Sequence, residues 1–395
     1  MFFLIINRAI TNRTYMVTKT RSLLLPLLCL VLVLCYDKEM KAQVYANKVV
    51  GQSNKEKRDS IETSGYPYML PIWGEAATKK GFDLPYSAGL SMQYVTQKSD
   101  ITIDNLSIGF NNGPMYSLSE VVRFNDATAQ TSGINLRPDI WLLPFLNVYG
   151  LFAQSKSSTA IDAGIWVPDS TNTWHEVMPL STKADFNGTT VGFGLTPTMG
   201  IGGGWLALDM NFAWTDIEAL DAPAYTFVFG PRMGKSFKLD DEEMNIAVWV
   251  GGFRLLLSSS TSGSMNLEDL FEMDGLQEKV DNGIIKVEDA QDQVNSWWSG
   301  LTPVEQKNPV NKAKYETANS AIDAASGFLT SIDGALNDEQ KASVQYSLEK
   351  SPKDKWNFIV GSQFQLNKSL MFRAEFGFLG SRTQFIGGIQ YRFGL

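Results

Sequence analysis

Cysteine and histidine are almost absent from this sequence of 395 residues. The two cysteines, Cys29 and Cys35, lie close to the N-terminus, and His175 is the single histidine. Disulfide frameworks, cysteine nucleophiles and cysteine–histidine zinc sites need more of these residues than the chain carries after position 42. We therefore expect neither a metal site nor a cofactor, and we do not expect an enzyme.

Charge is also scarce. Charged residues make up 19% of the chain, below the roughly 25% that is usual in soluble domains. The 42 acidic residues outnumber the 34 basic ones, which gives a net charge of −8, and no basic patch stands out that would favour a nucleic-acid partner. Aromatic residues reach 12%, and this content excludes a disordered chain.

Long apolar runs are missing except for one. A polytopic helical membrane protein needs several runs of about 20 residues, whereas this chain has a single shorter run at residues 23–34. A basic segment precedes that run, and this order is typical of a secretory signal peptide. We expect cleavage after Ala42 or Ala46 and assign residues 1–42 to an N-terminal extension and signal peptide, so the protein is predicted to be exported.

The remaining chain changes its pattern at Pro85. Residues 43–84 are polar, and we expect a periplasmic arm or a small plug there. From Pro85 onward, apolar residues alternate with small or polar ones in segments of about ten residues, which indicates half-buried strands. The predicted strands cover residues 86–98, 101–110, 118–129, 132–142, 145–157, 188–198, 203–214, 223–236, 244–258, 355–367, 369–381 and 384–395.

Two architectures would explain such strands. Their apolar face would point inward in a soluble sandwich, but it would face lipid in a transmembrane barrel, whose lumen is lined by the polar face. The export signal, the lack of cysteine after position 42 and the strand that ends the chain favour the barrel. The predicted fold class is therefore all-β: an antiparallel transmembrane β-barrel of about 12 strands. Residues 85–258 form its first part and residues 355–395 its last three strands.

An even number of strands places both termini on the periplasmic side. The short connections then fall on that side, and the two long ones, residues 158–187 and 259–354, fall outside. The second long connection has a helical pattern, and we predict that it is an extracellular helical insertion that caps or plugs the barrel. Its apolar stripe consists of Tyr315, Ala318, Ile322, Ala325, Leu329 and Ile332.

With these features the chain resembles Gram-negative outer-membrane β-barrel proteins as a class. The last strand carries the resemblance best, because Tyr391, Phe393 and Leu395 alternate up to the terminus. In that class the last strand resembles an assembly signal, and its final residue is usually aromatic, whereas here it is leucine. The resemblance implies a location in the cell outer membrane, contact with outer-membrane lipid, and the barrel-assembly machinery as a partner.

The charged residues on the predicted inner face are the best candidates for a functional site. Rings of charge select ions and polar solutes in pores, but mutually paired charges close and stiffen an interior. Barrels of about eight strands are filled by side chains and those of about sixteen are open, so twelve strands leave both alternatives open. The predicted lumen-lining residues are Arg137, Asp139, Asp209, Arg232, Arg373, Glu375 and Arg392.

The expected function is a channel or facilitator for a small solute. The alternative is a surface structural or binding protein in which the barrel is only a membrane anchor. An outer-membrane lipid hydrolase ranks third, because it needs a histidine beside a serine. His175 lies in the predicted outer loop without an obvious serine partner.

Overall fold

The computed structural model describes residues 66–395 except 81, 202, 240–242, 258–259 and 339–341. The predicted signal peptide and the first part of the predicted periplasmic arm, residues 43–65, lie outside the described residues. Within the described part, no helix combines the length and the apolar composition needed to cross a bilayer.

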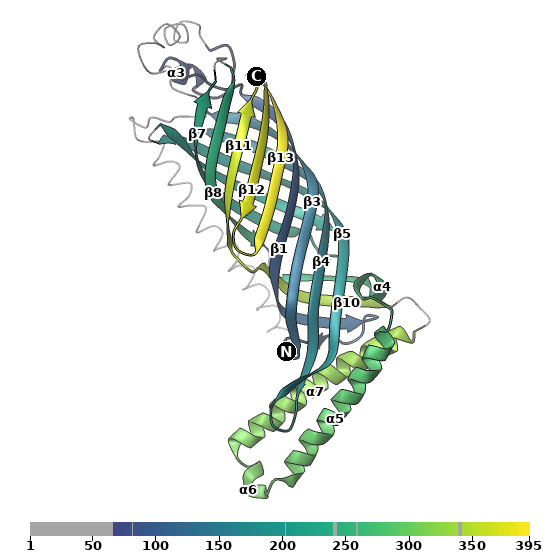
Figure 1. Ribbon diagram of the computed structural model, residues 1–395. Coiled ribbons are helices and arrows are strands. Elements are labelled where there is room, and N and C mark those ends of the chain that lie inside the picture. The colour runs from purple at the N-terminus through teal and green to yellow at the C-terminus, as the bar shows by residue number, and fades with distance from the viewer. Residues whose placement is uncertain (1–65, 81, 202, 240–242, 258–259, 339–341) are drawn as a thin grey trace, which may run out of the picture.

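Ten antiparallel strands close into a barrel, because the last strand pairs with the first. Figure 1 shows these strands tilted around one axis. The all-β antiparallel barrel predicted from the alternation is therefore confirmed. Its strands are β1 (Ala88–Phe110), β3 (Val122–Leu143), β4 (Leu146–Pro168), β5 (Trp174–Ile201), β6 (Gly204–Ile217), β7 (Ala224–Lys238), β8 (Asn245–Leu257), β11 (Trp356–Gln365), β12 (Leu370–Phe378) and β13 (Arg382–Phe393).

The predicted count of about twelve strands is wrong by two. The segments 86–98 and 101–110 belong to the single strand β1, and 118–129 and 132–142 belong to β3. Residues that looked like turns stay in the ladder: Asp100 pairs with Thr128, and Thr131 pairs with Gln97. Polar residues interrupt the apolar alternation there, but the backbone hydrogen bonding continues. Ten is also an even number, so both ends of the barrel chain still lie at the same end of the barrel.

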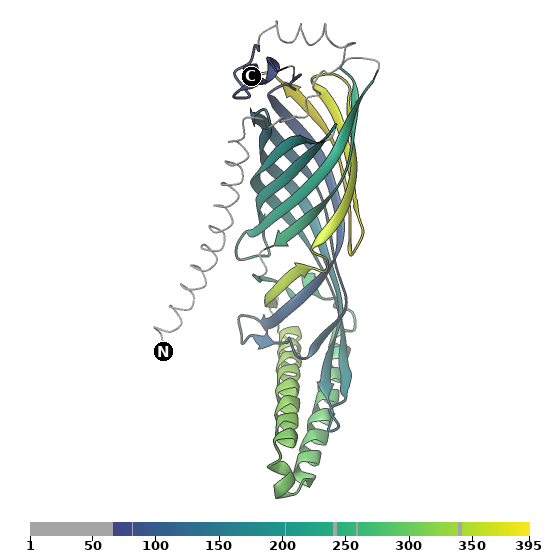
Figure 2. The ribbon, with the colours of Figure 1, turned by 90° about the vertical axis from the view of Figure 1, so that its left-hand side faces the viewer.

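Four strands, β1, β3, β4 and β5, are much longer than a membrane requires. A transmembrane strand needs about 9–11 residues, whereas β4 has 23 residues and β5 has 28. The excess continues past the barrel as an extension, which Figure 2 shows narrowing away from the barrel. The predicted long outer loop at 158–187 is therefore wrong, because it consists of the outer halves of β4 and β5 joined by a short turn at residues 169–173.

Three further strands complete the extension. The outer half of β1 pairs with β10 (Ser343–Pro352), and β10 pairs with β9 (Ser260–Asn266). The two-residue strand β2 (Tyr116–Ser117) also pairs with β1. The predicted helical insertion at 259–354 is thus only partly helical, since a strand lies near each of its ends. These two strands attach the helices to the extended sheet.

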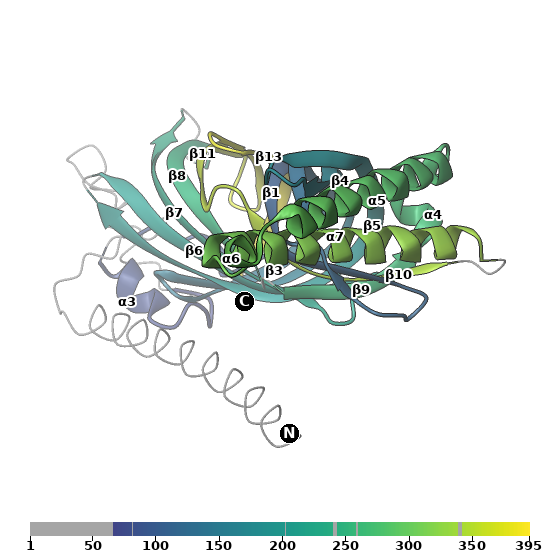
Figure 3. The same ribbon diagram turned by 90° about the horizontal axis from the view of Figure 1, so that it is seen from below.

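The helices between β9 and β10 are α4 (Leu267–Leu270), α5 (Leu276–Gly300), α6 (Pro303–Gln306) and α7 (Pro309–Leu336). The Asn308 side chain caps the start of α7, where Pro309 occupies the first turn. The two long helices α5 and α7 pack against each other and against β5 and β4 respectively. Figure 3 shows both helices from their end of the molecule.

The main apolar core lies in this extension, between the helices and the inner face of the sheet. Along β1 the side chains of the inner face therefore change from polar to apolar. Leu90 and Met92 are exposed on the outer wall of the barrel, while Ser91 points inward and is buried. Beyond residue 100, Ile101 and Ile103 occupy the same inward positions and are buried in the core. The barrel is thus apolar outside and polar inside, whereas the extension is apolar inside.

The described part of the predicted arm follows the barrel rim at the end where the chain terminates. The backbone N–H of Met69 donates to the carbonyl of Leu395 at 2.8 Å. The short helix α3 (Gly74–Thr78) lies at the same end (Figure 1). Phe82 then packs against Trp141, a residue that lines the interior.

Candidate functional site: the barrel interior

All seven charged residues predicted to face the lumen come together in the barrel interior. Six of them line an internal cavity of about 140 Å³, and Glu375 lies behind it, bonded to two of the six. Beside this cavity the charged side chains extend into the lumen and bind one another. The predicted residues in its lining are Arg137, Asp139, Asp209, Arg232, Arg373 and Arg392.

Arg232 holds the larger of two ionic clusters together. Its guanidinium donates to both carboxylate oxygens of Glu375, from Nε at 2.9 Å and from Nη2 at 3.1 Å. Its Nη1 donates to Oδ2 of Asp209 at 2.9 Å. A two-point contact of this kind is among the strongest hydrogen-bonded ion pairs that proteins form. The cluster links β7 to β12 on one side and to β6 on the other.

Glu375 accepts two further hydrogen bonds. Arg373 donates from Nη2 at 3.1 Å, and the indole of Trp249 donates from Nε1 at 2.9 Å, both to Oε2. The Arg373 guanidinium also stacks on the Trp249 ring, 4.8 Å from its centre. Only 2% of Glu375 is exposed, so its charge depends on these partners for compensation.

Asp209 is also bound by residues of β5 and β4, the strands on the other side of β6 from β7. Tyr149 and Thr196 donate their hydroxyls to its Oδ1, and Tyr149 also contacts Asn211. Arg137 lies over the Tyr149 ring, with its guanidinium carbon 3.9 Å from the ring centre. Tyr149 therefore connects Arg137 to the Arg232 cluster without an ion pair.

The second cluster lies nearer the chain termini. Arg392 donates from Nη1 to Oδ2 of Asp139 at 3.0 Å and from Nε to the carbonyl of Tyr86. The amides of Asn147 and Gln390 each donate to Asp139 at 2.7 Å. Side chains of β13 and β4 thus occupy three of the roughly four hydrogen-bond positions on the Asp139 carboxylate.

Small residues make room for the aromatic members of this network. A Cβ atom at Gly194 would lie 2.2 Å from the Tyr149 ring, and one at Gly361 would lie 2.3 Å from the Trp249 ring. These contacts are far closer than side-chain atoms tolerate. Glycine on the neighbouring strand is therefore required for Tyr149 and Trp249 to lie flat across the interior.

Sequence reasoning missed the uncharged members of the network. Tyr149, Trp249 and Thr196 all lie in predicted strands, and their inward position follows from the alternation. They carry no charge, but a buried tyrosine hydroxyl or indole N–H requires a hydrogen-bond partner. Aromatic residues on the polar face of the strands were the signal that could have found them.

The outer wall of the barrel is apolar. Large hydrophobic side chains are exposed there on most strands, as expected when the outer face meets lipid. The predicted assembly-signal residues Tyr391, Phe393 and Leu395 are also exposed at the end of the chain. Further exposed side chains of this wall are Leu90, Met92, Ile134, Leu136, Phe152, Val191, Phe193, Val248, Val250, Phe372 and Ile389.

His175 lies at the far end of the extension, outside the barrel. Its Nε2 lies 3.0 Å from Oδ2 of Asp169, in the turn between β4 and β5. Although burial raises the pKa of Asp169, hydrogen bonds from Thr171, Thr173 and His175 hold it well below its usual range. In the described part of the chain, no group of three or more histidine, cysteine, aspartate or glutamate residues is arranged to hold a metal ion.

No protein-family model and no curated protein sequence matches the chain. Solved structures with a similar arrangement include the β-domain of the Bordetella autotransporter BrkA, with 9% identity, 78% of this chain and 100% of that chain covered, and a TM-score of 0.28. An outer-membrane channel from Pseudomonas putida has 9% identity and a TM-score of 0.24, and the match covers 78% of this chain and 96% of that chain. A Pseudomonas aeruginosa FadL homologue has 7% identity and a TM-score of 0.25, and the match covers 89% of this chain and 99% of that chain.

At these identities and TM-scores the matches carry no functional inference. The closed antiparallel barrel with its apolar outer wall is by itself the architecture of outer-membrane β-barrel proteins. The class predicted from the last strand and from the alternation is thus reached from the geometry of the chain.

Proposed function

We propose that this protein is an outer-membrane β-barrel that anchors an ordered extracellular binding platform. The barrel supplies attachment to the membrane, and the extension of long strands with helices α5 and α7 supplies the platform. One observation carries the proposal: charged side chains fill the lumen and pair there, whereas the main apolar core lies outside the barrel. The main apolar core of the chain therefore lies in the extension, beyond the barrel.

Helices α5 and α7 form a helical hairpin, and the tip of this hairpin carries partly exposed aromatic residues. Trp298 stacks on Tyr315 with ring centres 4.4 Å apart, and Lys314 lies over the neighbouring Trp297. Exposed apolar residues surround this aromatic group, including Val304 and Val310. Partly exposed aromatic residues are frequent anchors in protein interfaces, so we assign partner binding to this tip.

Labelling in intact cells tests where the platform lies. The chain has no cysteine after Cys35, so Thr302→Cys at the hairpin tip and Lys79→Cys beside α3 each introduce a single reactive thiol. A membrane-impermeant maleimide should label Thr302→Cys in intact cells and label Lys79→Cys only after the outer membrane is permeabilised. The reverse pattern would contradict the proposed orientation.

A channel for a small solute is the second candidate, and the polar internal cavity of about 140 Å³ favours it. Planar-bilayer recordings separate the two functions. The anchor function predicts no conductance from the wild-type protein, whereas steady single-channel currents would support the channel. Replacing Arg373 and Glu375 together by alanine should open a conductance if the ionic cluster is what closes the lumen.

The proposal includes no catalysis. Lipid hydrolysis by the purified protein that disappears in His175→Ala would contradict this part of it. The matched control is Thr302→Ala, which changes an exposed residue on the same extension.

A further inference from the structure

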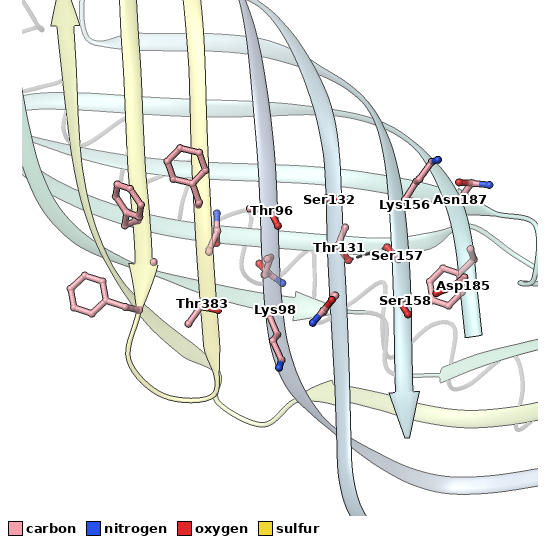
Figure 4. A pocket seen from close by; sticks show the side chains of 18 residues that line it. Thr96, Lys98, Thr131, Ser132, Lys156, Ser157, Ser158, Asp185, Asn187 and Thr383 are labelled. Atoms are coloured by element: carbon pink, nitrogen blue, oxygen red, sulfur yellow. Dashed lines mark hydrogen bonds between the residues drawn. The ribbon is translucent and has the colours of Figure 1, made fainter. Parts of the chain in front are cut away.

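A groove of about 980 Å³ crosses six neighbouring strands at the level where the barrel passes into the extension. Figure 4 shows it over β12, β13, β1, β3, β4 and β5. Each strand contributes three consecutive residues. Side chains alternate along a strand, and in each group the first and third residues point outward while the middle one points into the barrel. The outward positions can be assigned because Ser91 and Gln93 on β1 point inward and are buried.

Two lysines at outward positions of the barrel wall line this groove. Lys98 is on β1 and Lys156 is on β4, and both are exposed. Neither forms an ion pair with a residue that the structure describes. Strand β3 runs between them, with Gln130 opposite Lys98 and Ser132 opposite Lys156. Adjacent strands are about 4.8 Å apart and residues two positions apart are roughly 7 Å apart, so flexible side chains of both lysines reach the same bound group.

Hydroxyl and amide side chains line the space beside the lysines. Thr96 pairs with Ser132 across the β1–β3 ladder, and Asn187 pairs with Lys156 across the β4–β5 ladder. These groups donate hydrogen bonds, and together with two ammonium groups they form a surface that favours an anion with several oxygens. The one carboxylate in the groove is Asp185, at its β5 edge.

The other end of the groove is apolar. Phe376 and Phe378 on β12 are exposed, and Phe385 on β13 lies against Phe376 with ring centres 4.9 Å apart. The groove is therefore cationic and polar over β1, β3 and β4 and aromatic over β12 and β13. This combination matches a molecule with an anionic head and a hydrocarbon chain.

We infer that the groove binds a phosphate-bearing lipid of the leaflet that borders the extension. Lys98 and Lys156 bind the headgroup phosphate, Thr96 and Ser132 donate hydrogen bonds to it, and an acyl chain lies along Phe376. This inference rests on the proposed membrane placement of the barrel. Beyond that placement, it assigns a lipid with an anionic headgroup as the ligand of the groove.

Native mass spectrometry of the full-length protein in nonionic detergent tests the inference. The probes are phosphatidylglycerol, which is anionic, and phosphatidylcholine, whose headgroup is neutral overall. The wild-type protein should retain phosphatidylglycerol preferentially. Lys98→Gln/Lys156→Gln should weaken that binding by about ten-fold or more, since the loss of even one charge-assisted contact costs about that factor. Asp185→Asn should strengthen it.

Lys235→Gln is the matched control. Lys235 is an exposed lysine on β7, in the half of that strand nearer the chain termini, and its loss should leave the preference unchanged. Equal binding of both lipids, or full binding by the double lysine variant, would overturn the headgroup site. Gel mobility with and without heating reports barrel folding separately. If the double lysine variant folds, inserts into membranes and still binds phosphatidylglycerol, the lipid site is refuted and the proposed membrane placement is not.

Discussion

Arg232 and Glu375 form a two-point ion pair inside the barrel although 143 positions separate them in the chain. The pair joins β7 to β12, which are not neighbours in the sheet. Strands β8 and β11 lie between them, so the ion pair spans part of the interior and ties together two strands that share no backbone hydrogen bonds.

Removing Arg232 should destabilise the barrel strongly. Arg232→Met leaves the buried carboxylates of Glu375 and Asp209 without their main partner, and a broken buried ion pair costs about 3–5 kcal/mol. Urea unfolding in detergent micelles, followed by tryptophan fluorescence, measures the change in the free energy of unfolding. Lys235→Met on the same strand is the control, with an expected change below about 0.5 kcal/mol. Equal midpoints for the two variants would show that the ion pair does not stabilise the fold.

A charge on the outer wall tests lipid exposure. Val250 is near the middle of β8 and is exposed. Val250→Arg should cost about 2–4 kcal/mol when the barrel folds into lipid vesicles, because a cation near the bilayer midplane loses its hydration. Ala160→Arg, at an exposed outward position where β4 enters the extension, should fold almost normally. If both variants fold equally well, the outer wall does not face lipid.

Loss of one core side chain should unfold the helices α5 and α7 while the barrel stays folded. Phe328 on α7 is fully buried and packs on Phe110 of β1, with ring centres 5.7 Å apart. Phe328→Ala should destabilise the extension by about 3–5 kcal/mol through lost packing and a new cavity. We expect faster proteolysis of α5 and α7, while the heat-dependent gel shift of the barrel persists. Val310→Ala at the start of α7 is exposed and serves as the control.

The extension should become more stable at alkaline pH. Burial lowers the pKa of Lys350 to about 8, and its Nζ donates to Thr159. The unfolded chain has a lysine pKa of about 10.4, so between these values the unfolded state binds more protons and the free energy of unfolding rises with pH.

Denaturation at several pH values in this window measures the effect. Lys350→Met should remove the rise, whereas Lys353→Gln, which changes an exposed lysine just after β10, should retain it. A rise of equal slope in Lys350→Met would assign the pH dependence to another group.

The local pattern of residues was enough to predict an antiparallel barrel, the inward face of its strands and the apolar stripe of α7. Alternation determines which side of a strand is polar, and for that reason Asp209, Arg232 and Glu375 could be assigned to the interior before their contacts were known. The same alternation explains the outward position of Tyr391 and Phe393. These properties depend on the period of the side chains and require no knowledge of which strands pair.

The tertiary structure decided how long the strands are and what the charges bind. Continuity of β1 through Asp100 depends on hydrogen bonds to β3 and β13, which the polar residues around Asp100 do not reveal. The inner face of β1 changes there from polar to apolar because α5 and α7 cover the extension, whereas only side chains fill the barrel. Likewise, Arg232 meets Glu375 because the sheet curves into a barrel, and that curvature is a property of the whole set of strands.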